Sequence, residues 1–297
     1  MIYPDFFYDF NCIADKCRHT CCKGWEIDID DDTADYYLNM PGKLGERIRR
    51  SIEKHDGNEG YSFILTEDER CPMLRPDGLC DIILEEGDDL LCDICALHPR
   101  FYEDINDLTL AGLGFSCEAV CDLLLEKEKP VMFIEEEEEE SSSANEERLS
   151  FEELLNRLSI KSTFPDYSPK ISNERLSFTL NVMEKTEPIN DEWTAHLEAM
   201  KSASDEIIIE SGKPIDQVKL NNVYTYIFYR QLERITEYGI KSLTEYVRLC
   251  TDFIYYDSLF TGDLPEAVRR FSEQIEYSTE NVDILTHNQT WPEPYLS

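Results

Sequence analysis

Basic residues are scarce in this chain of 297 residues. Its 28 lysines and arginines stand against 63 aspartates and glutamates, a formal net charge of −35. Nucleic acids and anionic membranes are bound through basic patches, so we expect no nucleic-acid or membrane partner. Apolar runs are also short, and none approaches the roughly 20 residues that span a bilayer. The start, MIYPDFFYDFNC, lacks the basic and apolar regions of a secretory signal, which predicts a cytoplasmic protein.

Phosphate-binding glycine loops are missing as well. The sequence contains no G-x-G-x-x-G after an expected strand and no G-x-x-x-x-G-K, and Gly112-Leu113-Gly114 is too short to substitute for them. No nucleotide-binding fold is therefore predicted. The chain is nevertheless expected to fold, because 41% of its residues are hydrophobic and it carries 16 tyrosines and 14 phenylalanines.

Cysteine is abundant. Ten of the eleven cysteines lie between Cys12 and Cys121, and Cys250 stands apart. Stable disulfides are rare in a reducing compartment, so clustered thiols in a cytoplasmic protein favour metal binding or catalysis. A nucleophilic cysteine would need a nearby base, and only His19 and His98 are close in sequence. Because that chemistry does not explain so many thiols, we favour metal binding.

The spacing of the cysteines supports a metal centre. Separations of two to four residues let a turn or helix aim two sulfurs at one point, and thiolates select zinc, copper(I) or iron–sulfur clusters. The adjacent Cys21 and Cys22 cannot easily share one zinc ion, whereas a four-iron cluster spreads its ligands further apart. The candidate ligands are Cys17, Cys21, Cys22, Cys71, Cys80, Cys95 and Cys117. Cys121 and Cys250 fall on apolar stripes and are expected to be core thiols, and for Cys12 both roles remain open.

Apolar periodicity predicts a mainly α fold with a small β component. Gly24 to Asp30 alternates like a half-buried strand, and Asp30 and its acidic neighbours are N-cap candidates for a helix. Residues 218–235 form a broad apolar helix face that Gly239 should end. The acidic, serine-rich run at 135–148 predicts a linker. We therefore expect a cysteine-rich α+β metal-binding domain over 1–130, an acidic linker over 131–148 and an all-α helical domain over 149–297.

The order of the cysteine blocks resembles that of one known family. KCRHTCCKGWEIDID, CPMLRPDGLCDIILEEGDDLL, CALHPR and GFSCEA, together with NNVYTYIFYR at 221–230, closely resemble the flagellin lysine-N-methylase family. This resemblance implies an enzyme that transfers a methyl group from S-adenosylmethionine to lysine ε-amines of flagellin and contains an iron–sulfur cluster of the four-iron type. It places the family's cysteines on Cys17, Cys21, Cys22, Cys71, Cys80, Cys95 and Cys117, but not on Cys92 or Cys121.

The chain departs from the better-known radical S-adenosylmethionine enzymes. Their C-x3-C-x2-C motif would continue from Cys17 and Cys21 to a third cysteine, but Gly24 stands there. Arg75 and Arg100 flank cysteine blocks and are candidates to pair with the carboxylate of the methyl donor. The first half also resembles, more loosely, cysteine-rich zinc- or iron-chelating domains. The alternative function is therefore a non-enzymatic zinc- or iron-binding module that docks a partner.

Overall fold

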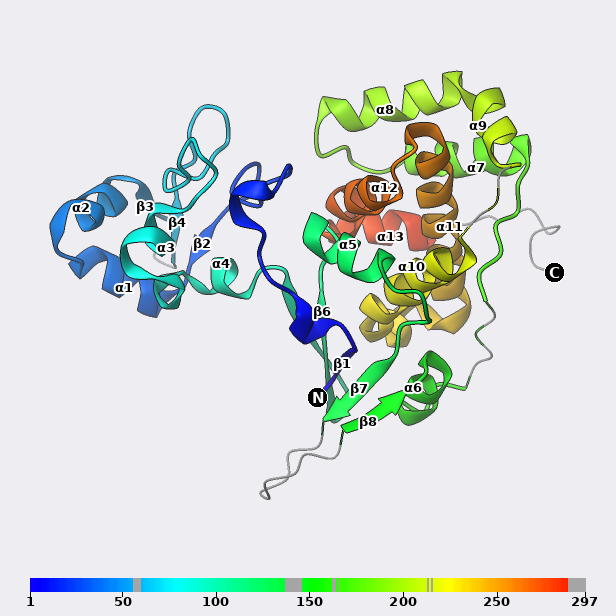
Figure 1. Cartoon of the computed structure of the whole chain (residues 1–297), viewed down its shortest axis with the longest axis horizontal. Coiled ribbons are helices and arrows are strands. Elements are labelled where there is room, and N and C mark those ends of the chain that lie inside the picture. The colour runs from blue at the N-terminus through cyan, green and yellow to red at the C-terminus, as the bar shows by residue number, and fades with distance from the viewer. Residues whose placement is uncertain are drawn as a thin grey trace. The chain divides into compact units, whose positions relative to one another are not determined.

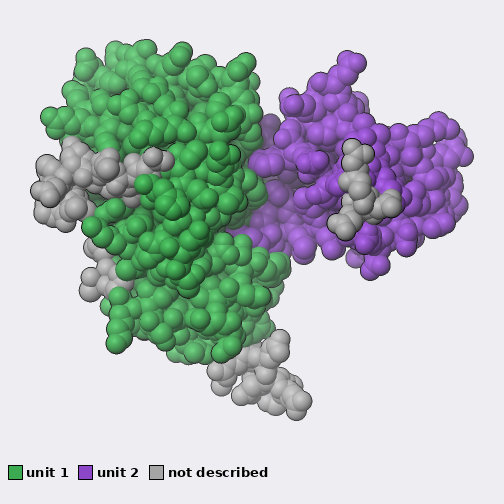
Figure 2. All heavy atoms as spheres, turned by 180° about the vertical axis from the view of Figure 1, so that it is seen from behind, with its two compact units in different colours: residues 1–10, 102–297 green, residues 11–101 purple. Residues whose placement is uncertain are grey.

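The computed structural model describes residues 1–55, 60–136, 146–161, 164, 166–212, 214 and 216–287 (Figure 1). The chain forms two compact units, which Figure 2 colours separately: unit 1 contains residues 1–10 and 102–297, and unit 2 contains residues 11–101. The fold is mainly α with small sheets, as predicted. The division differs from the expected boundary near residue 130, because residues 1–10 and 102–130 contribute strands and a helix to unit 1.

Unit 2 combines short helices with a three-stranded sheet. Its helices are α1 (Asp31–Asn39), α2 (Gly42–Arg50), α3 (Asp81–Glu86) and α4 (Asp93–Leu97), and its strands are β2 (Asp28–Ile29), β3 (Ile52–Lys54) and β4 (Tyr61–Phe63). The order β2-β4-β3 places β4 in the middle, antiparallel to both neighbours. Short 3₁₀ turns cover Ala14–Lys16 and Asp88–Leu90.

Asp30 begins helix α1 as the sequence predicts. One of its carboxylate oxygens accepts a hydrogen bond from the Thr33 backbone N–H at 2.9 Å, which satisfies a donor left without a partner in the first turn. The other oxygen accepts from the Asp93 backbone N–H at 2.9 Å. These hydrogen bonds lower the pKa of Asp30, although partial desolvation acts in the opposite direction. The same carboxylate therefore fixes the starts of α1 and α4.

Unit 1 contains a five-stranded sheet of order β5-β6-β1-β7-β8. The strands are β1 (Ile2–Pro4), β5 (Arg100–Ile105), β6 (Leu108–Leu113), β7 (Phe133–Glu136) and β8 (Glu146–Leu149). Strand β1 runs parallel to β6, with Ile2 opposite Leu110, and antiparallel to β7, with Tyr3 opposite Ile134. The first residues of the chain thus join two hairpins that are far from them in sequence.

The two ends of the acidic segment form strands β7 and β8, which pair antiparallel with Glu135 opposite Glu147. Residues 137–145, half of the predicted linker over 131–148, lie outside the described residues. Glu135 tolerates its buried position because both of its carboxylate oxygens lie 2.9 Å from Nε of Arg157. The acidic run therefore begins inside the sheet.

Helices make up the rest of unit 1. They are α5 (Glu118–Leu125), α6 (Phe151–Arg157), α7 (Asn173–Met183), α8 (Asp191–Ser202), α9 (Ser204–Glu210), α10 (Gln217–Arg230), α11 (Ile235–Thr261), α12 (Leu264–Phe271) and α13 (Thr279–His287). A π-helical turn (Ser272–Glu276) follows α12. Helix α11 contacts α7, α9, α10, α12 and α13 and forms the centre of this packing (Figure 1). The helix expected over residues 218–235 ends earlier, at Arg230. Gly239, with φ 75° and ψ 157°, instead interrupts the helical conformation within α11, which begins at Ile235.

Tyrosine hydroxyls on α10 bond to the backbone of the sheet. The Tyr226 hydroxyl accepts from the Leu113 N–H at 2.7 Å and donates to the Leu113 carbonyl oxygen at 2.9 Å. The Tyr229 hydroxyl lies 2.9 Å from the Ile2 carbonyl oxygen and 2.8 Å from that of Ala111. Helix α10 is thus fixed against β1 and β6.

No helix in the described ranges combines the length and apolar character needed to cross a membrane.

Replacing Arg175 by Met should strongly destabilise unit 1. Arg175 and Asp252 are both buried, Arg175 Nε donates to Asp252 at 2.7 Å, and the Tyr167 hydroxyl donates to the same carboxylate at 2.6 Å. The substitution leaves a buried carboxylate without its guanidinium partner, which costs about 3–5 kcal/mol. Urea unfolding followed by circular dichroism measures the loss. Lys201→Met, at a partly exposed ion pair with Glu184, should cost under about 1 kcal/mol. Equal losses in the two variants would contradict the prediction.

Glu103 should make stability depend on pH near neutrality. Desolvation and the neighbouring Glu233 carboxyl raise the pKa of Glu103 from 4.5 to about 7. The folded state therefore holds the proton more tightly, so this stabilisation is complete below pH 4.5 and is lost as pH rises through about 7. We compare the effect of Glu103→Gln on the free energy of unfolding at pH 8 with its effect at pH 4. The effect at pH 8 should be more stabilising by about 1 kcal/mol, because solvent screens this partly exposed carboxyl.

Urea unfolding of the Glu103 variant at both pH values measures this difference. The matched control is Glu198→Gln on α8, an exposed position that should leave the pH profile unchanged. A Glu103 variant whose stability changes with pH as the unsubstituted protein's does would show that the two carboxyls do not interact.

Candidate metal centre

Five cysteines of unit 2 gather in one apolar core. Cys71 and Cys92 are 7% and 1% exposed and belong to the core itself, beside buried side chains such as Ile27, Tyr37 and Met73. The half-buried Cys22, Cys80 and Cys95 pack against the same core. Residues separated by more than 70 positions thus bring their thiols into one region.

Turns and helix starts hold these cysteines in place. The Cys71 backbone N–H donates to the Cys22 carbonyl oxygen at 2.8 Å, which joins the first and second cysteine blocks. Cys80 immediately precedes α3 and forms an isolated bridge with Leu74 across the Pro76-Asp77-Gly78 turn, where Gly78 has a φ of +83°. That conformation strongly favours glycine. The turn returns the chain toward Cys71.

Cys92 and Cys95 occupy the start of helix α4. The Cys95 backbone N–H donates to the Cys92 carbonyl oxygen at 2.9 Å. The segment before Cys92 is held by the Tyr37 hydroxyl, which donates to the Leu90 carbonyl oxygen at 2.7 Å. The bond from the Asp93 N–H to Asp30 holds the other side. Both thiols therefore sit on a backbone anchored to α1.

The thiols influence one another's ionisation. A hydrogen bond with the Cys21 thiol lowers the pKa of Cys22 to about 7, and the nearby Arg70 guanidinium adds to this effect. A hydrogen bond between Cys92 and Cys95 lowers the pKa of Cys92 and raises that of Cys95.

Burial affects the pKa values of the remaining two thiols, those of Cys71 and Cys80. It raises the pKa of Cys71 to about 12, to which the Cys22 and Cys80 thiolates contribute, and it also raises the pKa of Cys80. Five thiolates cannot coexist in this core without positive charge, and a bound metal would supply that charge.

The other predicted ligands lie elsewhere. Cys21 is exposed and reaches the group through its bond to Cys22, and the Cys17 thiol donates to the His19 carbonyl oxygen at 3.3 Å. Cys117 precedes α5 in unit 1, whereas the five gathered cysteines belong to unit 2. Cys121 and Cys250 are fully buried, as expected for core thiols, and the Cys121 thiol donates to the Phe115 carbonyl oxygen at 3.1 Å.

Cys92 was not among the predicted ligands, yet it lies within the group. It is a buried member of the apolar core against which Cys22, Cys80 and Cys95 pack, and its thiol is hydrogen-bonded to that of Cys95. The Cys92-x2-Cys95 spacing in the sequence was the signal for it.

Arg75 and Arg100 differ in their surroundings. Arg75 is engaged with Asp77, with Nε 3.1 Å from Oδ1 and Nη2 2.7 Å from Oδ2, and lies 3.9 Å from Asp81. A cofactor carboxylate would have to displace this bidentate pair. Arg100 is half-buried at the first position of β5. Arg70 is the arginine whose charge acts on a thiol of the group.

Part of the chain is similar to proteins of known name. A stretch of 126 residues, 41% of this chain, is 27% identical to the "Lysine-N-methylase" of Salmonella choleraesuis (strain SC-B67) and to that of Salmonella typhimurium (strain LT2). The match spans 31% of the length of each of these relatives. The same share of the chain is 26% identical to the "Flagellar biosynthetic protein FliU" of Salmonella muenchen and covers 75% of it. No family model and no solved structure matches.

Replacing Cys95 by Ser should remove most of the bound metal, because the thiol lies among four others that need positive charge to ionise together. Iron, acid-labile sulfide and zinc are measured after anaerobic purification. Cys12→Ser, at an exposed thiol in the same unit, should leave the metal content unchanged. Cys250→Ala should also keep the metal and lower stability by about 1 kcal/mol through lost packing. Equal metal contents in the Cys95 and Cys12 variants would disprove this assignment.

Proposed function

We propose that this protein is a protein-lysine N-methyltransferase that acts on flagellin, takes its methyl group from S-adenosylmethionine and carries an iron–sulfur cluster on the cysteines of unit 2. The observation that carries the proposal is the similarity of 126 residues to proteins named lysine-N-methylase. The gathering of cysteines in one core supports the metal part of it. The name of the FliU relative supports a flagellar substrate.

The donor set fits an iron–sulfur cluster. Thiolates are the ligands such clusters use, and Cys22, Cys71, Cys80 and Cys95 would hold it, with Cys92 beside Cys95. One zinc ion bound at 2.3 Å would hold its sulfurs only about 3.8 Å apart. Among the described residues, no three cysteine sulfurs lie within 4.8 Å of one another. Thiolates that bind separate iron atoms of a cluster do not have to approach one another as closely as the ligands of one zinc ion.

The cluster would supply an iron with an open position for the amine and carboxylate of the methyl donor if only three thiolates bind it. Methyl transfer breaks the bond between the sulfonium sulfur and the methyl carbon and forms a bond from that carbon to the lysine nitrogen. The amine must first lose a proton to solvent or to a base, because an ammonium has no free electron pair. The protein's task is then to align amine and methyl group and to exclude water.

The acidic surface supports a protein substrate that presents lysines. With a formal charge of −35, the chain attracts cationic groups over distances up to about 10 Å at moderate ionic strength. A lysine side chain is such a group until it loses its proton. Association with substrate should therefore weaken as salt increases.

Anaerobically purified protein, incubated with S-adenosylmethionine and flagellin, should add methyl groups to flagellin lysines. Intact-mass and peptide mass spectrometry detect the increments. Flagellin whose lysines have been acetylated is the matched control and should gain nothing. The Cys95→Ser variant should be inactive, and Cys250→Ala should retain activity. An iron–sulfur protein that adds no methyl to flagellin would refute the transferase, and colourless protein with stoichiometric zinc would favour a binding module.

A further inference from the structure

The sheet of unit 2 has a polar face opposite its cysteine-lined core. Side chains alternate along a strand, so Ile27 and Ile29 point into the core while Glu26 and Asp28 point to the other side. The exposures follow this alternation, since the two isoleucines are buried and the two acidic residues are exposed. The carboxylates of Glu26 and Asp28 therefore lie on the same side of the chain, away from the core.

His55 reaches this face across the middle strand. Its backbone N–H donates to the Gly60 carbonyl oxygen at 3.2 Å, so it lies opposite Gly60 just beyond the end of β3. A side-chain carbon at Gly60 would lie 3.9 Å from Nδ1 of the imidazole, which places the ring over the glycine. Asp28 on β2 is paired with Ser62 on β4. Two small residues, Gly60 just before β4 and Ser62 within it, thus let the ring that follows β3 approach the carboxylate on β2.

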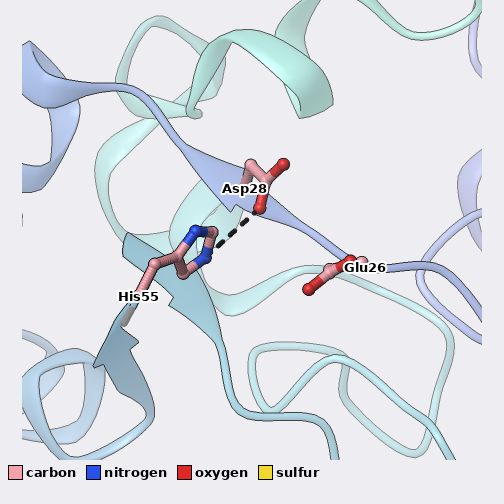
Figure 3. Close-up of side chains that lie close together, drawn as sticks. All are labelled: Glu26, Asp28 and His55. Atoms are coloured by element: carbon pink, nitrogen blue, oxygen red, sulfur yellow. Dashed lines mark ion pairs between the residues drawn. The ribbon is translucent and has the colours of Figure 1, made fainter. Parts of the chain in front are cut away.

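The three side chains converge. Figure 3 shows the His55 ring and the Glu26 carboxylate on the same side of the sheet as Asp28, with Nε2 of His55 3.5 Å from Oδ1 of Asp28. Ligand atoms of all three residues lie within 4.8 Å of one another, the only such group of His, Cys, Asp and Glu in the described part of the chain.

The imidazole nitrogen that faces this group is unusual. Nε2 of His55 has almost no contact with solvent and, within the described residues, no hydrogen-bond partner, although the side chain as a whole is 36% exposed. A polar atom that is shielded from solvent normally has a hydrogen-bond partner. Asp28 lies close enough for attraction but does not complete a hydrogen bond. A cation between the two would satisfy both the nitrogen and the carboxylate.

We propose that Glu26, Asp28 and His55 form a binding site for a first-row divalent cation, separate from the cysteines. One imidazole nitrogen and two carboxylate oxygens suit Mn²⁺, Fe²⁺ or Zn²⁺. A cation bound at about 2.1 Å holds its ligands roughly 3–3.5 Å apart, so small side-chain rotations from the present spacing are sufficient. The exposed carboxylates leave the remaining coordination positions to water. Alternation of the strand keeps this site on the face of β2 opposite Cys71 and Cys92.

Mn²⁺ is the appropriate probe, because it prefers oxygen and imidazole ligands to the thiolates of unit 2. The full chain, freed of loosely bound metal by a chelator, is titrated with Mn²⁺ in 0.15 M salt with excess Mg²⁺, which suppresses diffuse binding to the acidic surface. Electron paramagnetic resonance measures bound Mn²⁺, and pulsed measurements detect a coordinated imidazole nitrogen. We expect one site with nitrogen coupling. His55→Gln should abolish the coupling, and His55→Gln, Asp28→Asn and Glu26→Gln should each weaken binding at least about ten-fold.

Matched substitutions elsewhere separate the site from general charge effects. Asp35→Asn on α1 removes one exposed carboxylate, and His287→Gln on α13 removes one exposed imidazole; both variants should bind Mn²⁺ within two-fold of the unsubstituted chain. Glu26→Gln changes only an exposed side chain, so it reports on binding even if His55→Gln fails to fold. Binding without nitrogen coupling, or equal affinities in the Glu26 and Asp35 variants, would overturn the proposal.

Discussion

Thiols inside the apolar core are the constraint around which unit 2 is organised. A neutral thiol packs as a small apolar group, whereas a thiolate in the same place is a buried charge that needs a counter-charge. Cys71 and Cys92 have both properties. They pack with Ile27 and Tyr37 in the apolar core, and their thiols interact electrostatically with other cysteines. The compactness of this unit and the ionisation of its thiols are therefore linked, as they are in proteins whose metal site forms only on folding.

Unit 1 depends on a different kind of link. Its sheet joins the first residues of the chain to strands that begin after residue 100, and unit 2 is inserted in the sequence between them. Tyr226 and Tyr229 on α10 bond to backbone groups of β1 and β6. One helix from the second half of the chain thus bonds to strands of unit 1 that lie on both sides of the insertion in the sequence.

Local signals in the sequence predicted the local structure well. The N-cap at Asp30 follows from the position of one carboxylate. Gly239 does break the helical conformation, but the helix that it was expected to end already stops at Arg230. Pairing over long distances could not be predicted in the same way. Strand β1 is three residues long, and its partner at Leu110 is identified only by the fold. The six-glutamate run obscured β7 for a similar reason, because the charge pattern did not show that Arg157 would neutralise Glu135.

Part of the candidate metal centre could be predicted from the sequence. Spacing predicted Cys22, Cys71, Cys80 and Cys95 as ligands, and the structure packs these four in one core. Cys117 belongs to the other unit.

The Asp30 carboxylate accepts hydrogen bonds at the starts of two helices, α1 and α4. Serine or threonine could cap α1 but offers one oxygen, and asparagine offers one carbonyl oxygen where two acceptors are used. Only a carboxylate of this length serves both helices, so position 30 tolerates far less variety than an ordinary helix cap.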